Sequence, residues 1–377
     1  MKKSKSQMTV NAKYREVCET LRSEILGGKH PALKAFPSSV ALAKRFGTTR
    51  FTIRQALDRL IQDGLLKSYR GRGTFVTRLG ASRKIGLVVP SIDDSEFFQI
   101  IVPGLIRACQ AAGYAPVLCE VADAGPRERS RLAIGCVRSL VDEEVAGVIF
   151  QPMVALGRYN ANAAVAKYLS AKRIPLVLLN TDIVDPPKRS DYDVVGIDNV
   201  ESGFAVGKHL IGRGARRIAF LLRPDVPSVR NRFRGLCLAA QDGRTRTRLV
   251  VTEPGSRAGM ARVLRTFAPD AFVCGNDTAA AVLAQTLARL GQRVPDDVLL
   301  AGFDDIRHST IMTPQLTSVR QPCEDIARIA IARLLRRIAN PSEIPQAIRL
   351  PAPLVIRAST TRSSVKSVKT RSKGRKS

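Results

Sequence analysis

The hydrophobic positions of the first eighty residues follow the period of short helices. Tyr14, Val17, Leu21 and Ile25 fall on one stripe of a helix that ends at Gly27-Gly28. Only one face of such a helix can be buried, so we expect it to pack against further elements of a small domain.

Two more helices are predicted after a proline-containing turn. Ser38 can cap the second helix, Gly47 ends it, and Thr48-Thr49 begins the third. The apolar stripe of the third helix consists of Ile53, Ala56, Leu57 and Leu60. Its N-terminal half then exposes Arg50, Thr52, Arg54 and Gln55. Helix, tight turn and helix form the geometry that places such a face in the major groove of DNA.

A basic hairpin is predicted next. The residue pattern of 65–69 and 73–77 predicts two short strands joined by Arg70-Gly71-Arg72-Gly73. Glycines let the backbone approach a phosphate or enter a narrow minor groove, where flanking arginines are favoured.

From Ile85 onward, short apolar runs alternate with helical segments, which is typical of an α/β fold with parallel strands. The strand-like runs are 85–90, 115–120, 147–150, 176–179, 194–197, 218–222, 248–251, 271–274 and 298–301. The intervening helices are expected near 98–112, 127–142, 160–171, 200–213, 231–240, 257–266 and 277–290. The pattern repeats from residue 194, so it predicts two open parallel sheets with a cleft between them.

Positive charge is concentrated at the two ends of the chain. The 377 residues carry a net charge of +29. Residues 1–84 hold 19 basic and 5 acidic side chains, and residues 357–377 hold 8 basic and none acidic, which leaves a nearly neutral middle. A basic head and tail around such a body indicate a polyanionic partner.

Other chemistry is sparse. The seven cysteines lack paired metal-ligand spacing and lie mostly in apolar runs, so we expect reduced core thiols. No apolar segment follows the N-terminal lysines and no run reaches the length of a membrane span, which favours a cytoplasmic protein. We find no catalytic triad pattern, P-loop, dinucleotide motif or metal cluster, so neither an enzyme nor a cofactor is expected.

Residues 12–77 resemble the GntR family of winged helix-turn-helix regulators. The resemblance rests on Pro37-Ser38, on residues 48–66 and on the GRGTFV segment at 71–76. It implies DNA contacts from Ser38, Thr49, Arg50, Thr52, Arg54 and Gln55, and from the wing residues Arg70, Arg72 and Gly73. Ser39 and Val40 stand where the family often has glutamate and arginine, so a phosphate contact from the second helix is in doubt.

Residues 85–356, called the body below, resemble the sensor domain of the LacI/GalR family, which has the two-lobed fold of periplasmic binding proteins. The matching segments are residues 85–91, 196–220, 232–235, 272–283, 302–305 and 313–322. Lobe 1 is expected at about 85–183 and 318–338, and lobe 2 at about 192–306 and 346–356. Residues 1–11 would then form a basic extension, 78–84 a linker, and 357–377 a basic disordered tail.

The resemblance implies a site for an effector between the lobes, and the expected effector is a sugar or sugar derivative. Its expected residues are Phe97, Phe98, Asn180, Arg232, Asn276, Asp304 and Gln321. Carboxylate, amide and guanidinium groups suit a ligand rich in hydroxyls, although an arginine also suits a carboxylate or phosphate. The alternatives are that Asp304 and Asp305 cap a turn, that Asp277 caps a helix, that the two phenylalanines are core, and that Arg230 and Arg232 lie on the surface.

Together these features predict a homodimeric transcription regulator that binds an inverted-repeat operator in double-stranded DNA under the control of a small-molecule effector. Repression is the favoured output, and activation is the open alternative. A transport binding protein would carry an export signal and would lack a DNA-binding head, and the sequence meets neither condition. A nonspecific nucleic-acid binder would explain the charge but not the α/β body.

Overall fold

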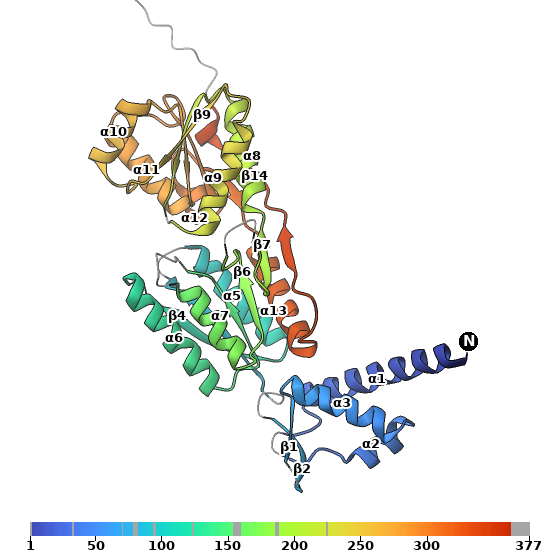
Figure 1. Ribbon diagram of the computed structural model, residues 1–377. Coiled ribbons are helices and arrows are strands. Elements are labelled where there is room, and N and C mark those ends of the chain that lie inside the picture. Colours follow the sequence, from blue (N-terminus) through green and yellow to red (C-terminus); the bar gives the residue numbers. More distant parts are fainter. Residues whose placement is uncertain are drawn as a thin grey trace, which may run out of the picture. The chain divides into compact units, whose positions relative to one another are not determined.

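The computed structural model describes residues 2–31, 34–69, 71–77, 82–92, 96–122, 124–153, 160–184, 188–223 and 225–362 (Figure 1). The chain divides into two compact units. The first comprises the residues up to Gly196 together with Cys323–Leu350, and the second comprises Ile197–Pro322 with the residues from Pro351 on.

The head, residues 2–77 of the first unit, has three helices and a hairpin, as predicted. They are α1 (Lys2–Leu26), α2 (Ser39–Phe46), α3 (Arg50–Gln62), β1 (Leu66–Tyr69) and β2 (Gly73–Val76). Ser38 caps α2, and Gly47 ends it in the left-handed conformation with φ 59°. The predicted stripes Val17, Leu21 and Ile25 of α1 and Ile53, Ala56 and Leu60 of α3 are all fully buried in one cluster. The head core is therefore the one that the hydrophobic pattern predicts.

Helix α1 begins earlier than expected, at Lys2 rather than near residue 12. Neither glycine nor proline interrupts residues 2–26, so nothing in the backbone ends the helix at the start of the apolar stripe.

The first unit contains a six-stranded sheet in the order β13-β7-β6-β5-β3-β4. Its strands are β3 (Lys84–Pro90), β4 (Ala115–Val121), β5 (Gly147–Phe150), β6 (Leu176–Leu179), β7 (Asp193–Ile197) and β13 (Ala347–Leu350). The pairs from β4 through β7 are all parallel. Helices α6 (Pro126–Asp142) and α7 (Ala161–Ala171) pack on one face through a common apolar cluster. The remaining helices, α5 (Glu96–Ala111) and α13 (Cys323–Ala339), pack against each other.

The second unit repeats this plan in the order β14-β12-β11-β10-β8-β9. Its strands are β8 (Arg217–Leu221), β9 (Arg246–Val250), β10 (Ala271–Cys274), β11 (Leu299–Asp304), β12 (Thr317–Arg320) and β14 (Leu354–Val355). Only the short β14 is antiparallel to its neighbour among the described pairs of this sheet.

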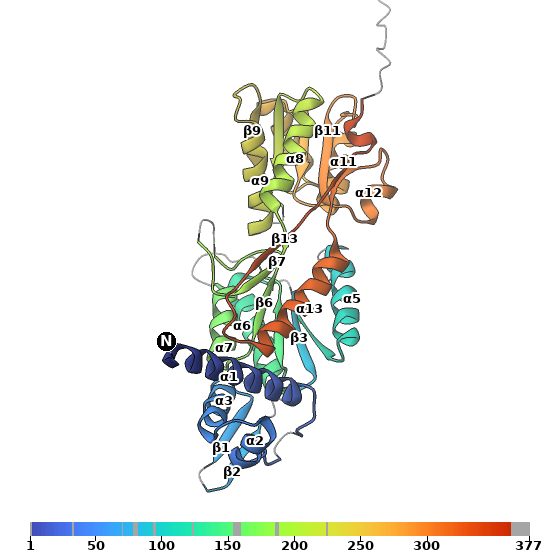
Figure 2. The same ribbon diagram turned by 90° about the vertical axis from the view of Figure 1, so that its right-hand side faces the viewer.

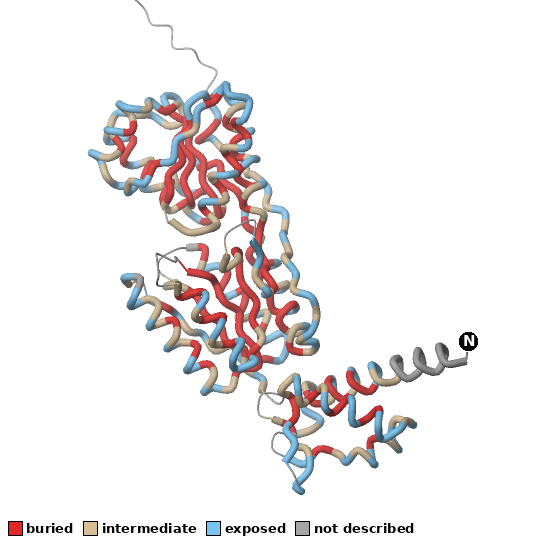
Figure 3. Tube along the Cα trace, in the orientation of Figure 1, coloured by how far each residue is buried: buried red, intermediate tan, exposed pale blue. Residues whose placement is uncertain are grey.

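Helices cover both faces of this second sheet (Figure 2). Along β8, Ile218 and Phe220 face α8 (Asn199–Gly212) and α9 (Pro227–Ala239), while Ala219 and Leu221 face α10 (Arg257–Phe267) and α11 (Asp277–Arg289). Two short helices, α12 (Arg307–Ile311) and the 3-10 helix η2 (Ala358–Thr360), complete the unit. Burial on both faces explains why the central strands are continuous apolar runs (Figure 3).

The expected lobe boundaries are displaced. Strand β7 was expected to open lobe 2, but it pairs with β6 in the first sheet. Strand β12 was expected in lobe 1, yet it pairs with β11 in the second sheet, and β13, expected in lobe 2, belongs to the first sheet. An apolar run predicts a buried strand in either sheet, so the hydrophobic pattern does not decide which neighbour it takes.

The expected tail also begins too early. Ser359 and Thr360 are buried, and the Ser359 hydroxyl donates to Leu300 O at 2.6 Å and accepts from Thr317 N at 2.8 Å. These small hydroxyl side chains satisfy backbone groups of the second sheet, a use that a Ser/Thr-rich composition does not reveal. Residues 363–377 lie outside the described part of the chain.

The cysteine expectation is wrong for two residues. Cys119 on β4 and Cys136 on α6 form a disulfide, and none of the other five cysteines, all described, belongs to one. The two partners are 17 positions apart in sequence, and only the packing of α6 beside β4 brings them together.

Candidate DNA-binding surface and ligand site

Helix α3 presents three of the predicted DNA-binding side chains. Thr49 is its N-cap, and its hydroxyl oxygen accepts a hydrogen bond from Thr52 N at 3.2 Å. Arg50, Arg54 and Gln55 are exposed along the following turns. Ser38, also exposed, caps α2 through a bond from Ala41 N at 3.2 Å. Ser38 is therefore the cap that the sequence predicted, and Thr49 caps the helix that was expected to begin at Thr48-Thr49.

Thr52 is a correction to the predicted face. Its side chain is only 3% exposed, and its hydroxyl lies 3.0 Å from the Thr49 hydroxyl. Thr52 precedes Ala56 by one helical turn and therefore joins the buried stripe. The exposed position beside Arg50 belongs instead to Phe51, which is 67% exposed and was not predicted.

The wing is a regular hairpin. Strands β1 and β2 pair antiparallel with Leu66 opposite Val76 and Tyr69 opposite Gly73. Arg72 and Gly73 are exposed at the tip, and the φ of Gly73 is 100°, a conformation that favours glycine. Arg70 lies outside the described residues.

Electrostatics distinguishes the arginines of this surface from those that hold the head together. Arg22 and Arg59 pair with Asp63, and Arg45 pairs with Glu24. No carboxylate within the described residues forms an ion pair with Arg50, Arg54 or Arg72. Their charge is therefore available to a polyanion.

In the second unit, two glycines set the separation of α8 and α9. A Cβ on Gly203 would stand 1.9 Å from Arg232 O, and one on Gly235 would stand 2.0 Å from Val200 O. Because glycine lacks that atom, the two helix backbones approach closely, and this approach brings the Arg232 side chain inside the unit.

Arg232 is 5% exposed and fully engaged. Its Nε donates to Asn199 Oδ1 at 2.9 Å and its Nη1 to Gly275 O at 2.6 Å. The guanidinium lies over the Phe303 ring, 4.5 Å from the centroid. Arg230, two positions earlier on α9, is exposed and pairs with Asp225, so Arg232 is the arginine of the interior.

Asp304 ends β11 and receives Arg232 Nη2 at 3.5 Å and Gln321 Nε2 at 2.6 Å, both at Oδ1. Burial raises the pKa of Asp304, while Arg232 and Gln321 act in the opposite direction. Burial also lowers the pKa of Arg232, which Asp304 partly offsets. The φ of Asp304 is 107°, a strained value for a residue other than glycine that marks the strand end as a candidate functional position.

Asn276 directly follows Gly275, the acceptor of Arg232, and is half-buried. Its Oδ1 caps α11 by accepting from Ala279 N at 2.8 Å, so Asn276, and not Asp277, is the helix cap. The Asn276 Nδ2 group has no hydrogen-bond partner within the described chain, and it is free to donate to a ligand.

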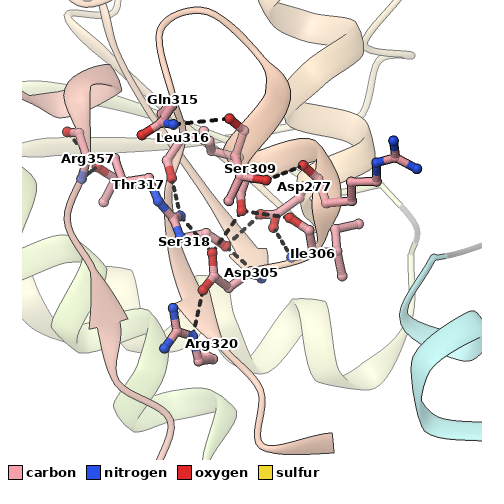
Figure 4. Close-up of polar contacts among 12 residues, drawn as sticks. Asp277, Asp305, Ile306, Ser309, Gln315, Leu316, Thr317, Ser318, Arg320 and Arg357 are labelled. Carbon is pink, nitrogen blue, oxygen red and sulfur yellow. Dashed lines mark hydrogen bonds and ion pairs between the residues drawn. The ribbon is translucent and has the colours of Figure 1, made fainter.

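Asp277 and Asp305 are structural carboxylates of the same edge (Figure 4). Asp277 Oδ1 accepts from the Ser318 hydroxyl at 2.6 Å and Oδ2 from Ile306 N at 3.1 Å. Asp305 pairs with Arg320 at 2.7 Å and Arg357 at 2.6 Å.

The two carboxylates differ in their electrostatics. Burial, together with the nearby Asp304, raises the pKa of Asp277 well above its ordinary value. For Asp305, burial acts upward, but the bonds from Arg357, Ser309 and Arg320 outweigh it and lower the pKa. Asp305 therefore ties α12, β12 and the segment after β14 together as a charged group.

The remaining predicted ligand residues lie in the first unit. Asn180, 8% exposed, follows β6, and its Nδ2 donates to Gln151 Oε1 at 3.0 Å. Its Oδ1 is buried and accepts no hydrogen bond from a described residue, and its φ is 62°. Gln151, at the end of β5 and equally buried, was missed because glutamine after a strand carries no distinctive spacing.

Phe97 and Phe98 begin α5, with ring centroids 5.4 Å apart. Phe97 is buried and Phe98 half-buried, so the core alternative describes Phe97 better than Phe98. The fold thus brings Arg232, Asn276, Asp304 and Gln321 together at one sheet edge of the second unit, whereas Phe97, Phe98 and Asn180 belong to the first.

Two negative findings apply to the described residues. They contain no group of three histidine, cysteine or acidic side chains arranged to hold a metal ion. None of their helices combines the length and apolar character required to cross a bilayer.

Comparison with known proteins agrees with this architecture. A family profile described as "Bacterial regulatory proteins, gntR family" matches residues 13–76, and one described as "Periplasmic binding protein-like domain" matches residues 208–360. The arabinose metabolism transcriptional repressor of Geobacillus stearothermophilus is 29% identical over 366 residues, covering 92% of this chain and 97% of that protein. The HTH-type transcriptional repressor PurR of Pectobacterium carotovorum subsp. carotovorum is 28% identical, covering 75% and 81%.

Solved structures share the fold. The transcriptional regulator CelR in complex with cellobiose matches with a TM-score of 0.63 and 23% identity, covering 86% of this chain and 100% of that one. A LacI family regulator from Enterococcus faecium with bound ribose matches with a TM-score of 0.60 and 24% identity, covering 73% and 98%. The curated relatives are transcription repressors and not enzymes. The chain therefore joins an N-terminal head that matches the gntR-family profile to a body that matches the periplasmic-binding-protein-like profile, and it is a DNA-binding transcription regulator.

Proposed function

We propose that the protein is a cytoplasmic repressor whose affinity for its operator is controlled by a small neutral ligand rich in hydroxyl groups, a sugar or sugar derivative. The observation that carries this proposal is the group formed by Arg232, Asp304 and Gln321, each less than one-tenth exposed, at the end of β11 and β12. Such a set of fixed donors and acceptors is costly to bury and is typical of a polar ligand site.

The charge state of this group favours a neutral ligand over an anion. Asp304 lies 3.5 Å from the Arg232 guanidinium, and Asp277 adds a second carboxyl group nearby. The positive charge of Arg232 is therefore already compensated, which disfavours binding of a carboxylate or phosphate. Both contacts of Asp304 end at Oδ1, which leaves Oδ2 to accept from a ligand hydroxyl.

The first unit contains a buried hydrogen-bond acceptor that also favours a ligand with hydroxyl groups. Asn180 Oδ1 is a buried acceptor without a partner among the described residues, and an unmade hydrogen bond of this kind costs about 1–3 kcal/mol. A ligand hydroxyl is a donor that removes this cost. The role of Phe97 and Phe98 as side chains that shape a ligand site stays a prediction.

On the DNA side, the proposal assigns base contacts to Arg50, Arg54 and Gln55 and backbone contacts to Ser38, Thr49, Arg72 and Gly73. These side chains are exposed on α3, at the helix starts and at the wing. Two copies of the chain would place two heads on an inverted-repeat operator. The relatives named as repressors support repression as the output.

The test begins with a thermal-shift screen of the full chain against pentoses, hexoses, disaccharides and sugar acids. A ligand at 100 times its dissociation constant adds about 2.7 kcal/mol of stability, which is a measurable shift. The hit is then titrated against the chain bound to promoter DNA, with fluorescence anisotropy as the readout. Operator affinity that no bound ligand changes would refute the regulatory part of the proposal.

Two arginines of α9 provide a matched pair for locating the site. Arg232→Met removes the interior guanidinium, and Arg230→Met removes an exposed one on the same helix. We expect the ligand-induced shift to vanish in the first variant and to persist in the second. Gln321→Leu gives an independent check, because it removes a donor to Asp304 without removing a charge.

A further inference from the structure

The exposed face of α3 carries one apolar side chain among polar ones. Phe51 is 67% exposed, and its neighbours at one helical turn, Arg54 and Gln55, are exposed as well. All thirteen phenylalanines lie in the described residues, and only Phe51 and Phe204 count among the exposed large hydrophobic side chains, Phe204 at 41%. Phe51 is therefore the most exposed aromatic ring of its kind in the chain.

No packing contact among the described residues accounts for this ring. It belongs to none of the described aromatic pairs or cation–π contacts and lies outside the buried cluster of the head. The adjacent Thr52 and Ile53 fill the inner face of the helix, so the backbone directs Phe51 away from the core. Singly exposed hydrophobic residues are common on protein surfaces, so exposure alone decides nothing.

The surroundings of Phe51 decide its role. It lies in the first turn of the helix between two arginines that no described carboxylate neutralises, Arg50 and Arg54. When Arg50 and Arg54 bind a DNA duplex, the base edges come close to the Phe51 ring that lies between them. In the major groove only thymine offers an apolar group, its C5-methyl, and phenylalanine is among the side chains that contact it.

We propose that Phe51 is a specificity-determining residue that selects thymine by contact with its C5-methyl group, at a base pair next to the one contacted by Arg54. The inference rests on the proposed function, since it requires α3 to enter the major groove. It adds an apolar element to a surface that otherwise reads bases through hydrogen bonds. Gln55 and Arg54 cannot supply this discrimination, because neither has an apolar end group.

The test removes one methyl group at a time from the DNA. Duplexes bound by the full-length protein are first selected from a randomised pool, and each thymine of the selected half-site is then replaced by deoxyuridine, which keeps every base-pairing group. We expect one position per half-site where the wild-type affinity falls about fourfold, the value of one buried methyl group. Phe51→Ala should bind the thymine and deoxyuridine duplexes equally at that position.

Phe204→Ala is the matched control, because it makes the same truncation at an exposed site on α8 in the second unit. It should retain the wild-type loss, and Phe51→Leu should retain part of it. Two results would overturn the inference: a wild-type protein indifferent to every methyl group, or a Phe51→Ala variant with the wild-type loss at the same position. Failure of the wild-type protein to select any sequence would instead refute the proposed function itself and the inference with it.

Discussion

Replacing Gly203 by alanine tests whether the close approach of α8 and α9 holds the interior arginine. The new Cβ would stand 1.9 Å from Arg232 O and 2.7 Å from its carbonyl carbon. A carbon atom beside a carbonyl oxygen needs about 3.3 Å, so α9 would have to retreat by roughly 1.4 Å. The atoms in the way are backbone, and no side-chain rotation relieves the overlap.

The magnitude follows from what this retreat breaks. Arg232 donates at 2.9 Å to Asn199 on α8 and at 2.6 Å to Gly275 after β10, and a shift of that size takes both bonds out of range. Overpacking costs about 1–3 kcal/mol, and each lost bond to a charged group costs about 1.5–3 kcal/mol. The gain from alanine in a helix is only about 1 kcal/mol, so destabilisation wins. These terms give a net loss of about 3–8 kcal/mol, and its lower end already lowers the melting temperature of the unit by about 6–12 °C.

Differential scanning calorimetry of the full chain is the appropriate assay, because the sequence contains no tryptophan to report unfolding by fluorescence. Gly212→Ala is the matched control: Gly212 ends the same helix, and a Cβ there would meet nothing within 4 Å. We expect this control to melt at or slightly above the wild-type temperature. A Gly203→Ala chain that melts as high as the control would show that the helices are not packed this closely.

Three further predictions concern charge. Arg54→Ala should cost about 1–3 kcal/mol of operator binding and relax sequence preference at about one base position, and unchanged base preference in a selection experiment would contradict our placement of the recognition face. Arg72→Ala should weaken binding to all duplexes alike and reduce the slope of log affinity against log salt by about 0.9, as measured by anisotropy at several salt concentrations; an unaltered slope would exclude a phosphate contact. Asp305→Asn should lose about 1.5–3 kcal/mol at neutral pH, because it removes the counter-charge of the largely covered Arg357 and of the exposed Arg320. The pKa of Asp305 lies below its ordinary 3.8 in the folded protein, so the wild-type advantage is complete above that value and shrinks as pH falls below it; an advantage that faded already between pH 7 and 5 would argue against this pairing.

The regular elements were predictable because local patterns determine them. The buried stripes of α1 and α3, the caps Ser38 and Thr49, and the parallel strands of both sheets follow from periodicity and capping chemistry within a few residues. Each of these signals acts between neighbours in sequence. The resemblance to the two regulator families supplied the rest of the architecture.

Within the candidate ligand site, the residues expected to lie near one another do so where residue type and strand position coincide, while their role toward a ligand stays a prediction. Arg232, Asp304 and Gln321 do meet, because the ends of β11 and β12 and the start of α9 share one edge of a sheet. The inward turn of Thr52 and the outward turn of Phe51 were not predicted. Thr52 is polar but buried, and Phe51 is apolar but exposed, so residue type alone gives the wrong direction for both side chains. The packing of α3 in the head decides which of them faces solvent.

The sequence by itself determined where most of the helices and strands lie, which face of the head helices is apolar, and that basic charge is concentrated at the ends of the chain. Only the tertiary structure decided which sheet receives β7, β12 and β13, which cysteines meet, and which carboxylate faces an arginine. The reason is physical: hydrophobic period and capping act over one or two turns. Strand pairing, burial of charge and hydrogen-bond partners join segments that are separate in sequence, by 17 residues for Cys119 and Cys136 and by 140 for Arg333 and Asp193.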